Sequence, residues 1–382
     1  MEKSTSETAR TNYDRTKVAL IFGGQSPEHG VSCLTAASVL QAMESSRFDV
    51  VAVGITKRGR WTQVPLDVVA NYAVVDGKVP EVADGDRDAV WMLGASGCEV
   101  ASRDGESLVD VHGVDVAFAL LHGPYGEDGT IQGLFEMMGI RYVGSGVAAS
   151  AIGMDKHHMK VAFEAAGLPV WPYVVATVRR WQDERESVVG EVSELQFPVF
   201  VKPCRGGSSL GITRVTDSTG LEAAILDAQS HDPKVIIEQG FVGARELECA
   251  VLANPGAADG CDASTIGEVR VLVKDGFYDF EAKYIADDQA ALDIPAVIPI
   301  ELSGRIQDVA RKAFKAVGAE GLARVDVFAT SDGEVWVNEI NTMPGFTEIS
   351  MFPKLMQHDG MTYARLVARL IDLAMTRTVG LR

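Results

Sequence analysis

The sequence has few cysteines, and these form no recognisable pattern. The five are odd in number and widely spaced, and no two form a C-x-x-C pair: Cys33, Cys98, Cys204, Cys249 and Cys261. This spacing argues against a disulfide framework and against a zinc site, and it favours a reducing compartment. The longest apolar runs, such as Val116–Leu121, have the length of a strand and are too short to span a bilayer. Residues 1–16 lack the apolar stretch of a signal peptide, so we expect a flexible tail there and a soluble, cytoplasmic protein.

Positive charge is also scarce. The chain has 35 lysines and arginines against 53 aspartates and glutamates, which gives a formal net charge of −18. So acidic a surface repels phosphate backbones, and we therefore expect no nucleic acid as partner. The lack of a spanning apolar run leads us to expect no membrane as partner either. Two nucleotide-binding motifs are missing as well, since the sequence contains no G-x-x-x-x-G-K-[ST] and no G-x-G-x-x-G. A nucleotide site would need a locally basic pocket of another kind.

The length of 382 residues predicts two or three domains. An apolar run at 17–22, two glycines and a helical pattern at 31–43 are typical of a parallel α/β domain, which strands at 50–55 and 114–121 continue. Residues 76–107 predict hairpins and loops, and helices are expected at 130–138 and 148–166. From residue 197 the pattern indicates an α+β unit, with helices at 220–229 and 306–317. We expect mixed α/β and α+β architecture, with a tail at 1–16 and domains over 17–144, 145–237 and 238–382.

Residues 322–330 and 334–341 alternate polar and apolar side chains on either side of Asp332-Gly333, a strong hairpin signal. A two-residue turn there places Asp326 opposite Glu339 and Arg324 opposite Asn341, with all four on one face. Facing carboxylates repel each other, so this pair predicts a bound cation, and the oxygens of Asp326, Glu339 and Asn341 suit Mg²⁺. Two alternatives stay open: a solvated edge hairpin, and a three-residue turn that would shift the register.

A glycine-rich loop at 202–211 joins two strands and offers N–H and hydroxyl donors to phosphate oxygens. Lys202 ends an apolar strand, where an unpaired charge is costly unless it meets an anion. A second lysine, Lys156, follows Met154-Asp155. The alternative is an ordinary flexible hairpin.

Two further loops follow buried strands. Residues 23–28 place Glu28 near a helix start, and residues 121–129 place His122, Glu127 and Asp128 at the end of another strand. Ligands bind at this edge of open α/β sheets. The alternatives are helix capping by Ser26 and a structural role for the histidine.

These segments, in this order, resemble the D-alanine–D-alanine ligases of the ATP-grasp superfamily. The matching stretches cover essentially residues 17–375: 23–28, 121–123, 126–133, 144–146, 154–156, 202–211, 281–284, 324–326 and 338–345. The resemblance implies a three-domain ATP-grasp fold with an N-terminal parallel-sheet domain. It also implies joining of two D-alanines through an acyl phosphate, with release of ADP and phosphate, for the peptidoglycan of the cell wall. Gly30 and Met351 depart from residues common in the family.

Roles are implied residue by residue. The residues implied to bind ATP are Lys156, Lys202, Ser209, Glu238, Glu246 and Lys283. Those implied to hold the two D-alanines are Glu28, His122, Arg324, Gly345, Ser350 and Met351. Those implied to act in catalysis are Glu28, Ser208, Tyr284, Arg324 and Ser350. The ligands of two Mg²⁺ (or Mn²⁺) ions are implied to be Asp326, Glu339 and Asn341. A homodimer is expected, because the family is usually dimeric.

The stretch 285–299 is expected to act as a lid over the reactive acyl phosphate, with Tyr284 at its base. Family members that make D-alanyl-D-lactate lack this tyrosine, so the resemblance favours an amine as the second substrate. The alternative is that Tyr284 only packs the lid. Three rivals are a regulatory nucleotide-binding protein, a dinucleotide oxidoreductase, and an ATP-grasp enzyme that joins other substrates.

Overall fold

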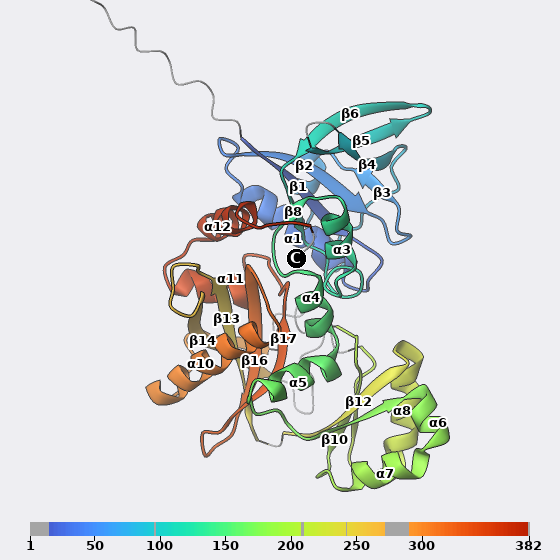
Figure 1. Ribbon diagram of the computed structural model, residues 1–382, viewed down its shortest axis with the longest axis vertical. Coiled ribbons are helices and arrows are strands. Elements are labelled where there is room, and N and C mark those ends of the chain that lie inside the picture. Colours follow the sequence, from blue (N-terminus) through green and yellow to red (C-terminus); the bar gives the residue numbers. More distant parts are fainter. Residues whose placement is uncertain (1–14, 95–96, 208–209, 242, 272–289, 381–382) are drawn as a thin grey trace, which may run out of the picture.

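The computed structural model describes residues 15–94, 97–207, 210–241, 243–271 and 290–380. Three larger sheets, named first, central and third by their order in the sequence, make up most of the fold, and a smaller hairpin sheet projects from the first (Figure 1). In space the third sheet lies between the first and the central one (Figure 1). Among the described residues, no helix has the length and apolar character that crossing a membrane requires. Most of the predicted tail lies outside the described residues.

The first sheet has the strand order β3-β2-β1-β7-β8, and only β3 runs antiparallel to its neighbour. Its elements are β1 (Thr16–Gly23), α1 (His29–Ala42), β2 (Phe48–Ile55), β3 (Trp61–Gln63), α2 (Leu66–Ala70), β7 (Val116–Ala119), α3 (Thr130–Met137) and β8 (Arg141–Tyr142). The predicted parallel α/β opening is confirmed. Because β1 lies between β2 and β7, the loops after β1 and β7 meet at the switch point of the sheet, where such folds bind ligands.

The hairpin sheet begins in the segment 76–107, for which the sequence predicts hairpins and loops, and extends beyond it to residue 114. Its antiparallel strands are β4 (Asp88–Gly94), β5 (Gly97–Asp104) and β6 (Ser107–Val114).

The central sheet is antiparallel, in the order β11-β10-β12-β9. Its elements are β9 (Tyr173–Thr177), α6 (Val178–Asp183), α7 (Arg185–Ser193), β10 (Val199–Pro203), β11 (Thr213–Val215), the 3-10 turn η1 (Ser218–Gly220), α8 (Leu221–His231) and β12 (Lys234–Gln239). Along β10, Val199 and Val201 are buried beneath the helices, so the alternation of a strand turns Phe200 and Lys202 to the opposite face. The predicted boundary at 237 falls inside β12.

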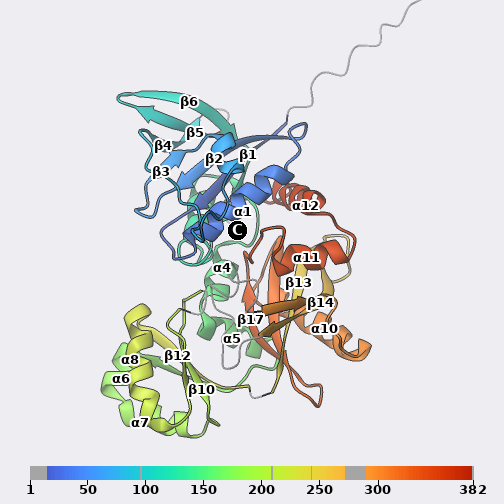
Figure 2. The same cartoon turned by 180° about the vertical axis from the view of Figure 1, so that it is seen from behind.

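The third sheet is antiparallel, in the order β15-β14-β13-β16-β17. Its elements are β13 (Arg245–Ala253), β14 (Cys261–Val271), β15 (Ala290–Asp293), α10 (Ile300–Ala316), β16 (Leu322–Ala329), β17 (Val335–Asn341), α11 (Met351–His358) and α12 (Tyr363–Met375). Helix α10 packs on one face through Ile306 and Phe314. Helices α11 and α12 share a second core with Leu20 and Phe118 of the first sheet, so apolar packing joins the two ends of the chain, and α12 lies beside α1 (Figures 1 and 2).

The single helix expected over 148–166 is wrong in one respect. The segment forms two helices, α4 (Val147–Met154) and α5 (Lys156–Ala165), because Asp155 adopts an extended backbone between them. The Asp155 carboxylate caps α5 by accepting hydrogen bonds from the backbone N–H groups of His157 and His158, both 3.2 Å long. The apolar periodicity runs through this position and hides the capping signal. The break makes Lys156 the first residue of α5.

Candidate active site

A cavity of about 540 Å³ lies between the central sheet, the third sheet and the loops of the first sheet. Most residues that the sequence singles out line it together: Glu28, His122, Lys156, Lys202, Glu238, Glu246, Arg324, Asp326, Glu339, Asn341 and Gly345. Four others, Ser208, Ser209, Lys283 and Tyr284, lie outside the described residues, as does much of the expected lid. Residues from all three thirds of the chain therefore meet at one place.

The predicted register of the β16–β17 hairpin is confirmed, although its cause differs from the expected one. Asp326 lies opposite Glu339, and Arg324 lies opposite Asn341. The turn, however, contains three residues, since Thr330 and Glu334 close it by a backbone hydrogen bond of 3.0 Å. A bulge in β17 then restores the register between Val327 and Asp326. The two one-residue offsets cancel before the strands reach the cavity.

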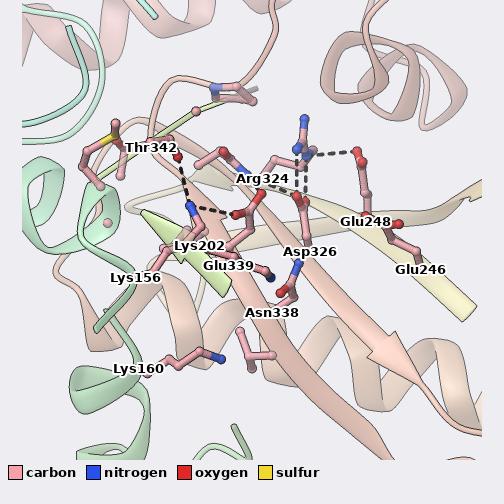
Figure 3. A pocket seen from close by; sticks show the side chains of 18 of the residues that line it. Lys156, Lys160, Lys202, Glu246, Glu248, Arg324, Asp326, Asn338, Glu339 and Thr342 are labelled. Atoms are coloured by element: carbon pink, nitrogen blue, oxygen red, sulfur yellow. Dashed lines mark hydrogen bonds and ion pairs between the residues drawn. The ribbon is translucent and has the colours of Figure 1, made fainter. Parts of the chain in front are cut away.

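Three carboxylates form a row across three adjacent strands. Glu248 on β13 pairs with Asp326 on β16, which pairs with Glu339 on β17. Arg324 lies against this row, with its Nε 2.9 Å from Glu248 and 2.7 Å from Asp326 (Figure 3). Burial alone would lower the pKa of Arg324, but the two carboxylates outweigh burial and raise it, so the guanidinium stays charged.

The Asn341 side chain completes this face. Its Nδ2 donates to Asp326 at 3.2 Å and to Glu339 at 3.5 Å, so the amide partly offsets the repulsion between the facing carboxylates. Within the described ranges, no three His, Cys, Asp or Glu side chains gather as metal ligands. The donor set that fits a hard cation is two carboxylates and this amide, which would have to turn its oxygen toward the metal.

The opposite wall of the cavity carries the reverse arrangement of charge. The Glu238 carboxylate on β12 lies between two ammonium groups, 2.8 Å from Lys160 Nζ and 2.6 Å from Lys202 Nζ. Burial alone would raise the pKa of Glu238, yet the two lysines outweigh burial and hold it well below its ordinary value. For Lys202, Glu238 likewise outweighs burial and raises the pKa. The anion that the apolar surroundings of Lys202 require is thus supplied by the chain itself.

Lys156 connects the two walls. Its Nζ donates to the backbone oxygen of Gly206 at 3.1 Å and lies 3.7 Å from Glu339 Oε2 (Figure 3). The ammonium group therefore joins the glycine-rich loop to the carboxylate row.

An aromatic slot closes one end of the cavity. Trp171 stacks on Phe241 with ring centroids 3.8 Å apart, and Phe241 packs on Phe328 at 4.2 Å. All three rings line the cavity, and flat apolar faces of this kind suit a heteroaromatic base.

The loops of the first sheet close the other end. Ser26 Oγ donates to the His122 carbonyl at 2.7 Å, so the loops after β1 and β7 do lie together. Glu28 approaches the backbone at Gly123 and Gly207, where any added Cβ would lie 2.9 Å from its Oε2. Burial lowers the pKa of His122, outweighing the Glu28 charge, so the imidazole is neutral at pH 7.

Ser350 and Met351 are not among the residues that line the cavity. Ser350 Oγ lies 2.7 Å from Thr347 Oγ1, and Met351 is only 5% exposed and packs into the core under α11. Gly30, the other departure from the family pattern, packs against a different segment. A Cβ at Gly30 would lie 2.2 Å from a methyl group of Val79, so the segment around Val79 leaves no room for a side chain at position 30.

Two charged residues of the site carry no prediction from the sequence. Lys160 stands one helical turn after Lys156, so both face the cavity from α5. Glu248 stands two residues after Glu246 on β13, so the two share one face of the strand. The spacing of four residues in a helix and of two in a strand is the sequence signal that could have identified Lys160 and Glu248.

Two antiparallel sheets that enclose a cavity, with lysines on one wall and carboxylates on the other, define an ATP-grasp enzyme. Two family models match the chain: "D-ala D-ala ligase N-terminus" at residues 17–145 and "D-ala D-ala ligase C-terminus" at residues 162–372. The chain belongs to the D-alanine–D-alanine ligase family.

Individual relatives agree in fold and sequence. A D-alanine–D-alanine ligase of Pseudarthrobacter chlorophenolicus is 50% identical over 370 residues, which cover 96% of each chain. The structure of the VanG D-Ala:D-Ser ligase from Enterococcus faecalis is similar with a TM-score of 0.78 and 33% identity, covering 94% of this chain and 100% of that one. The structure of the D-alanine-D-alanine ligase from Coxiella burnetii is similar with a TM-score of 0.79 and 29% identity, covering 96% of this chain and 95% of that one. The predicted ATP-grasp fold is confirmed.

Proposed function

We propose that this chain joins two molecules of D-alanine into D-alanyl-D-alanine at the expense of ATP, for peptidoglycan precursors of the cell wall. The observation that carries the proposal is the opposed charge of the two cavity walls, with a lysine-bound carboxylate facing a row of three carboxylates. A metal–triphosphate has the complementary distribution, because its phosphates are anionic and its metal is cationic. The full-length relatives named D-alanine–D-alanine ligase support the choice of substrate.

The nucleotide would lie along the cavity from the aromatic slot to the carboxylate row. Its base would enter beside Trp171 and Phe241, with Glu238 at the adenine amino group and Glu246 at the ribose. Lys156 and Lys202, with Ser209 of the glycine-rich loop, would hold the phosphate oxygens. These residues bind and orient ATP so that its γ-phosphate points toward Arg324.

Asp326, Glu339 and Asn341 would hold Mg²⁺ or Mn²⁺, and we propose two ions per site. A divalent metal at this position would neutralise charge on the phosphate oxygens. The chain contributes the fixed row of oxygen ligands and, through Arg324, a permanent positive charge beside them.

In the first step, the carboxylate of one D-alanine attacks the γ-phosphorus of ATP, and an acyl phosphate and ADP form. Glu28 and His122 would bind this D-alanine, while Lys283 and Arg324 would stabilise charge on the transferring group. In the second step, the deprotonated amine of another D-alanine attacks the acyl carbonyl, and phosphate leaves. Gly345, which lines the cavity, would receive the second substrate. Ser350 and the backbone of Met351, which lie behind this lining, would complete that subsite, and Ser208 and Tyr284 would link Glu28 to the lid.

The choice of second substrate is part of the proposal. D-lactate enters as an anion, whereas D-alanine carries an ammonium group that offsets its carboxylate. We expect the amine at neutral pH, on the strength of Tyr284 in the family pattern. D-serine is the sharpest competitor, because a relative at 33% identity is named a D-Ala:D-Ser ligase.

We also propose a cytoplasmic homodimer, with domains over residues 17–144, 145–237 and 238–382 and a tail before them. The reducing compartment fits the five cysteines, all of which are free and buried.

The test is phosphate release from ATP with D-alanine, compared with L-alanine, and product masses from equal D-alanine and D-lactate, or equal D-alanine and D-serine, at pH 6 and pH 8. We expect activity with D-alanine but not L-alanine, and D-alanyl-D-alanine as the main product in each mixture. Predominant depsipeptide at both pH values, or predominant D-alanyl-D-serine, would refute the substrate assignment.

A further inference from the structure

The backbone of one residue after β17, Met343, is held from both sides by the loop that follows β7. The backbone N–H of Met343 donates to Glu127 Oε1 at 3.2 Å, and the backbone oxygen of Met343 lies 3.2 Å from His122 Nδ1. A carbonyl oxygen can only accept, so Nδ1 carries the proton and donates to it, which fixes the tautomer of the imidazole. Two side chains of the β7–α3 loop, Glu127 and His122, thus form hydrogen bonds with the N–H and the C=O of Met343, which follows β17.

The β7–α3 loop is folded so that Glu127 turns inward. Its Oε2 also accepts the backbone N–H of Gly123 at 2.8 Å, and its own N–H donates to the Gly123 oxygen at 2.9 Å. Gly126 allows this tight fold, since a Cβ there would lie 2.5 Å from the Leu121 oxygen. The neighbouring Asp128 carboxylate stays within the loop, where it accepts from the N–H groups of Tyr125 and Thr130, both at 2.9 Å.

Met343 occupies a decisive place in the chain. It follows the strand that carries Glu339 and Asn341 and precedes Gly345, and residues 338–345 all line the cavity. Any shift of the Met343 backbone would move the strand end proposed to bind metal relative to the loop that would receive the second substrate.

We propose that Glu127 is a positioning residue that fixes the backbone of Met343. It thereby aligns the β7–α3 loop, which carries His122, with the end of β17, which carries Glu339 and Asn341. The carboxyl group suits this role because each of its two oxygens accepts from a different backbone N–H. A glutamine amide has an acceptor oxygen for only one of them, and its NH₂ group would face the other donor. The kinetic part of this inference depends on the proposed function, but the structural part does not.

The first experiment measures amide hydrogen exchange of the full chain without substrates. In Glu127→Ala the Met343 amide should exchange about tenfold faster or more, as expected for the loss of one buried hydrogen bond. In the matched control, Asp128→Ala, faster exchange should stay within residues 123–131. Unchanged protection of Met343 in Glu127→Ala, or the same loss of protection in Asp128→Ala, would overturn the proposal.

The second experiment measures kinetics and includes Glu127→Gln, which preserves size in case the alanine variant does not fold. We expect kcat to fall about 10- to 100-fold in Glu127→Gln, as for a small misalignment of reacting groups, with KM for D-alanine raised and KM for ATP unchanged. Asp128→Asn should keep wild-type kinetics. Wild-type kcat and KM for D-alanine in Glu127→Gln would contradict the assigned role, whereas a wild-type chain inactive with D-alanine would instead refute the proposed function.

Discussion

The two walls of the cavity are built from the same kind of interaction with opposite balance. On the central sheet, one carboxylate, Glu238, is shared by the ammonium groups of Lys160 and Lys202. On the third sheet, one guanidinium, Arg324, is shared by the carboxylates of Glu248 and Asp326. Both clusters are largely buried, and in both the pairing keeps the shared group ionised, since the pKa of Glu238 is lowered and that of Arg324 is raised.

The difference teaches what each wall is for. Buried ion pairs contribute little net stability, because desolvation offsets most of the attraction between the charges. A cluster with one surplus charge is less favourable still, unless a ligand supplies the counter-charge. Among the residues just named, the central-sheet cluster has two cations and one anion, which suits phosphate, while the third-sheet cluster has two anions and one cation, which suits a metal. Under the proposed function, each wall would be half of a site that the metal–nucleotide completes.

The largest effect is expected at Glu339. In Glu339→Gln one of the two facing carboxylates loses its charge, so turnover should be abolished while the thermal midpoint without nucleotide stays unchanged or rises slightly. Steady-state assays and thermal unfolding measure the two quantities. Near-normal turnover at saturating Mg²⁺ would remove Glu339 from the metal site.

A smaller but still large effect is expected at Arg324. In Arg324→Ala, kcat should fall about 10²- to 10³-fold, while the dissociation constant of ATP changes far less, because the contact acts mainly on charge that develops in the transition state. Arg324→Lys keeps the charge but not the forked geometry and should recover only part of the rate. A loss confined to ATP affinity would make Arg324 a ground-state phosphate anchor.

Most residues of the carboxylate wall could be predicted from the sequence, but only some residues of the lysine wall. The strand period of two and the repulsion of facing carboxylates led to Asp326, Glu339 and Asn341, and the register held because a three-residue turn and a bulge compensate each other. Neither irregularity has a clear local signature. The hairpin prediction was therefore right at the cavity and wrong at the turn.

Lys160 shows why the rest could not be predicted. A lysine in the middle of a helix is ordinarily solvated, and only the tertiary fold buries this one, to 1% exposed, against Glu238. Its orientation also depends on the helix break at Asp155, which the apolar periodicity conceals. The fold class, in contrast, was predictable, because alternating strands and helices with short glycine turns restrict the topology.

A third prediction concerns stability at the central sheet. Glu238→Gln leaves Lys160 and Lys202 facing each other without a carboxylate, so the chain should lose about 3–5 kcal/mol of stability. Lys160→Met removes one of two cations and preserves the Lys202 pair, so its loss should be smaller. Denaturant unfolding of both variants measures the order, and equal losses would show that Glu238 is not shared as the structure indicates.

The smallest effect concerns pH. Burial, with the Glu28 charge adding to it, raises the pKa of Glu127 to about 8, from 4.5. Folded chains therefore hold this proton between about pH 4.5 and 8, while unfolded chains release it, so this group's contribution to stability falls as pH rises through that window. Glu127→Gln has no such proton. The thermal midpoint of the variant minus that of wild type should therefore increase as the pH is raised from 5 to 8. A constant difference would contradict the raised pKa.

The most direct test of the opposed walls is calorimetric titration of ADP into wild type, Lys202→Met and Glu339→Gln, each with excess Mg²⁺ and with EDTA. If the central sheet binds phosphate and the third sheet binds metal, Lys202→Met should weaken ADP binding under both conditions. Glu339→Gln should weaken it only with Mg²⁺; in EDTA it should bind ADP as well as wild type or better, because Lys156 is released from Glu339. Equal weakening of Glu339→Gln with and without metal would contradict the division of roles between the two walls.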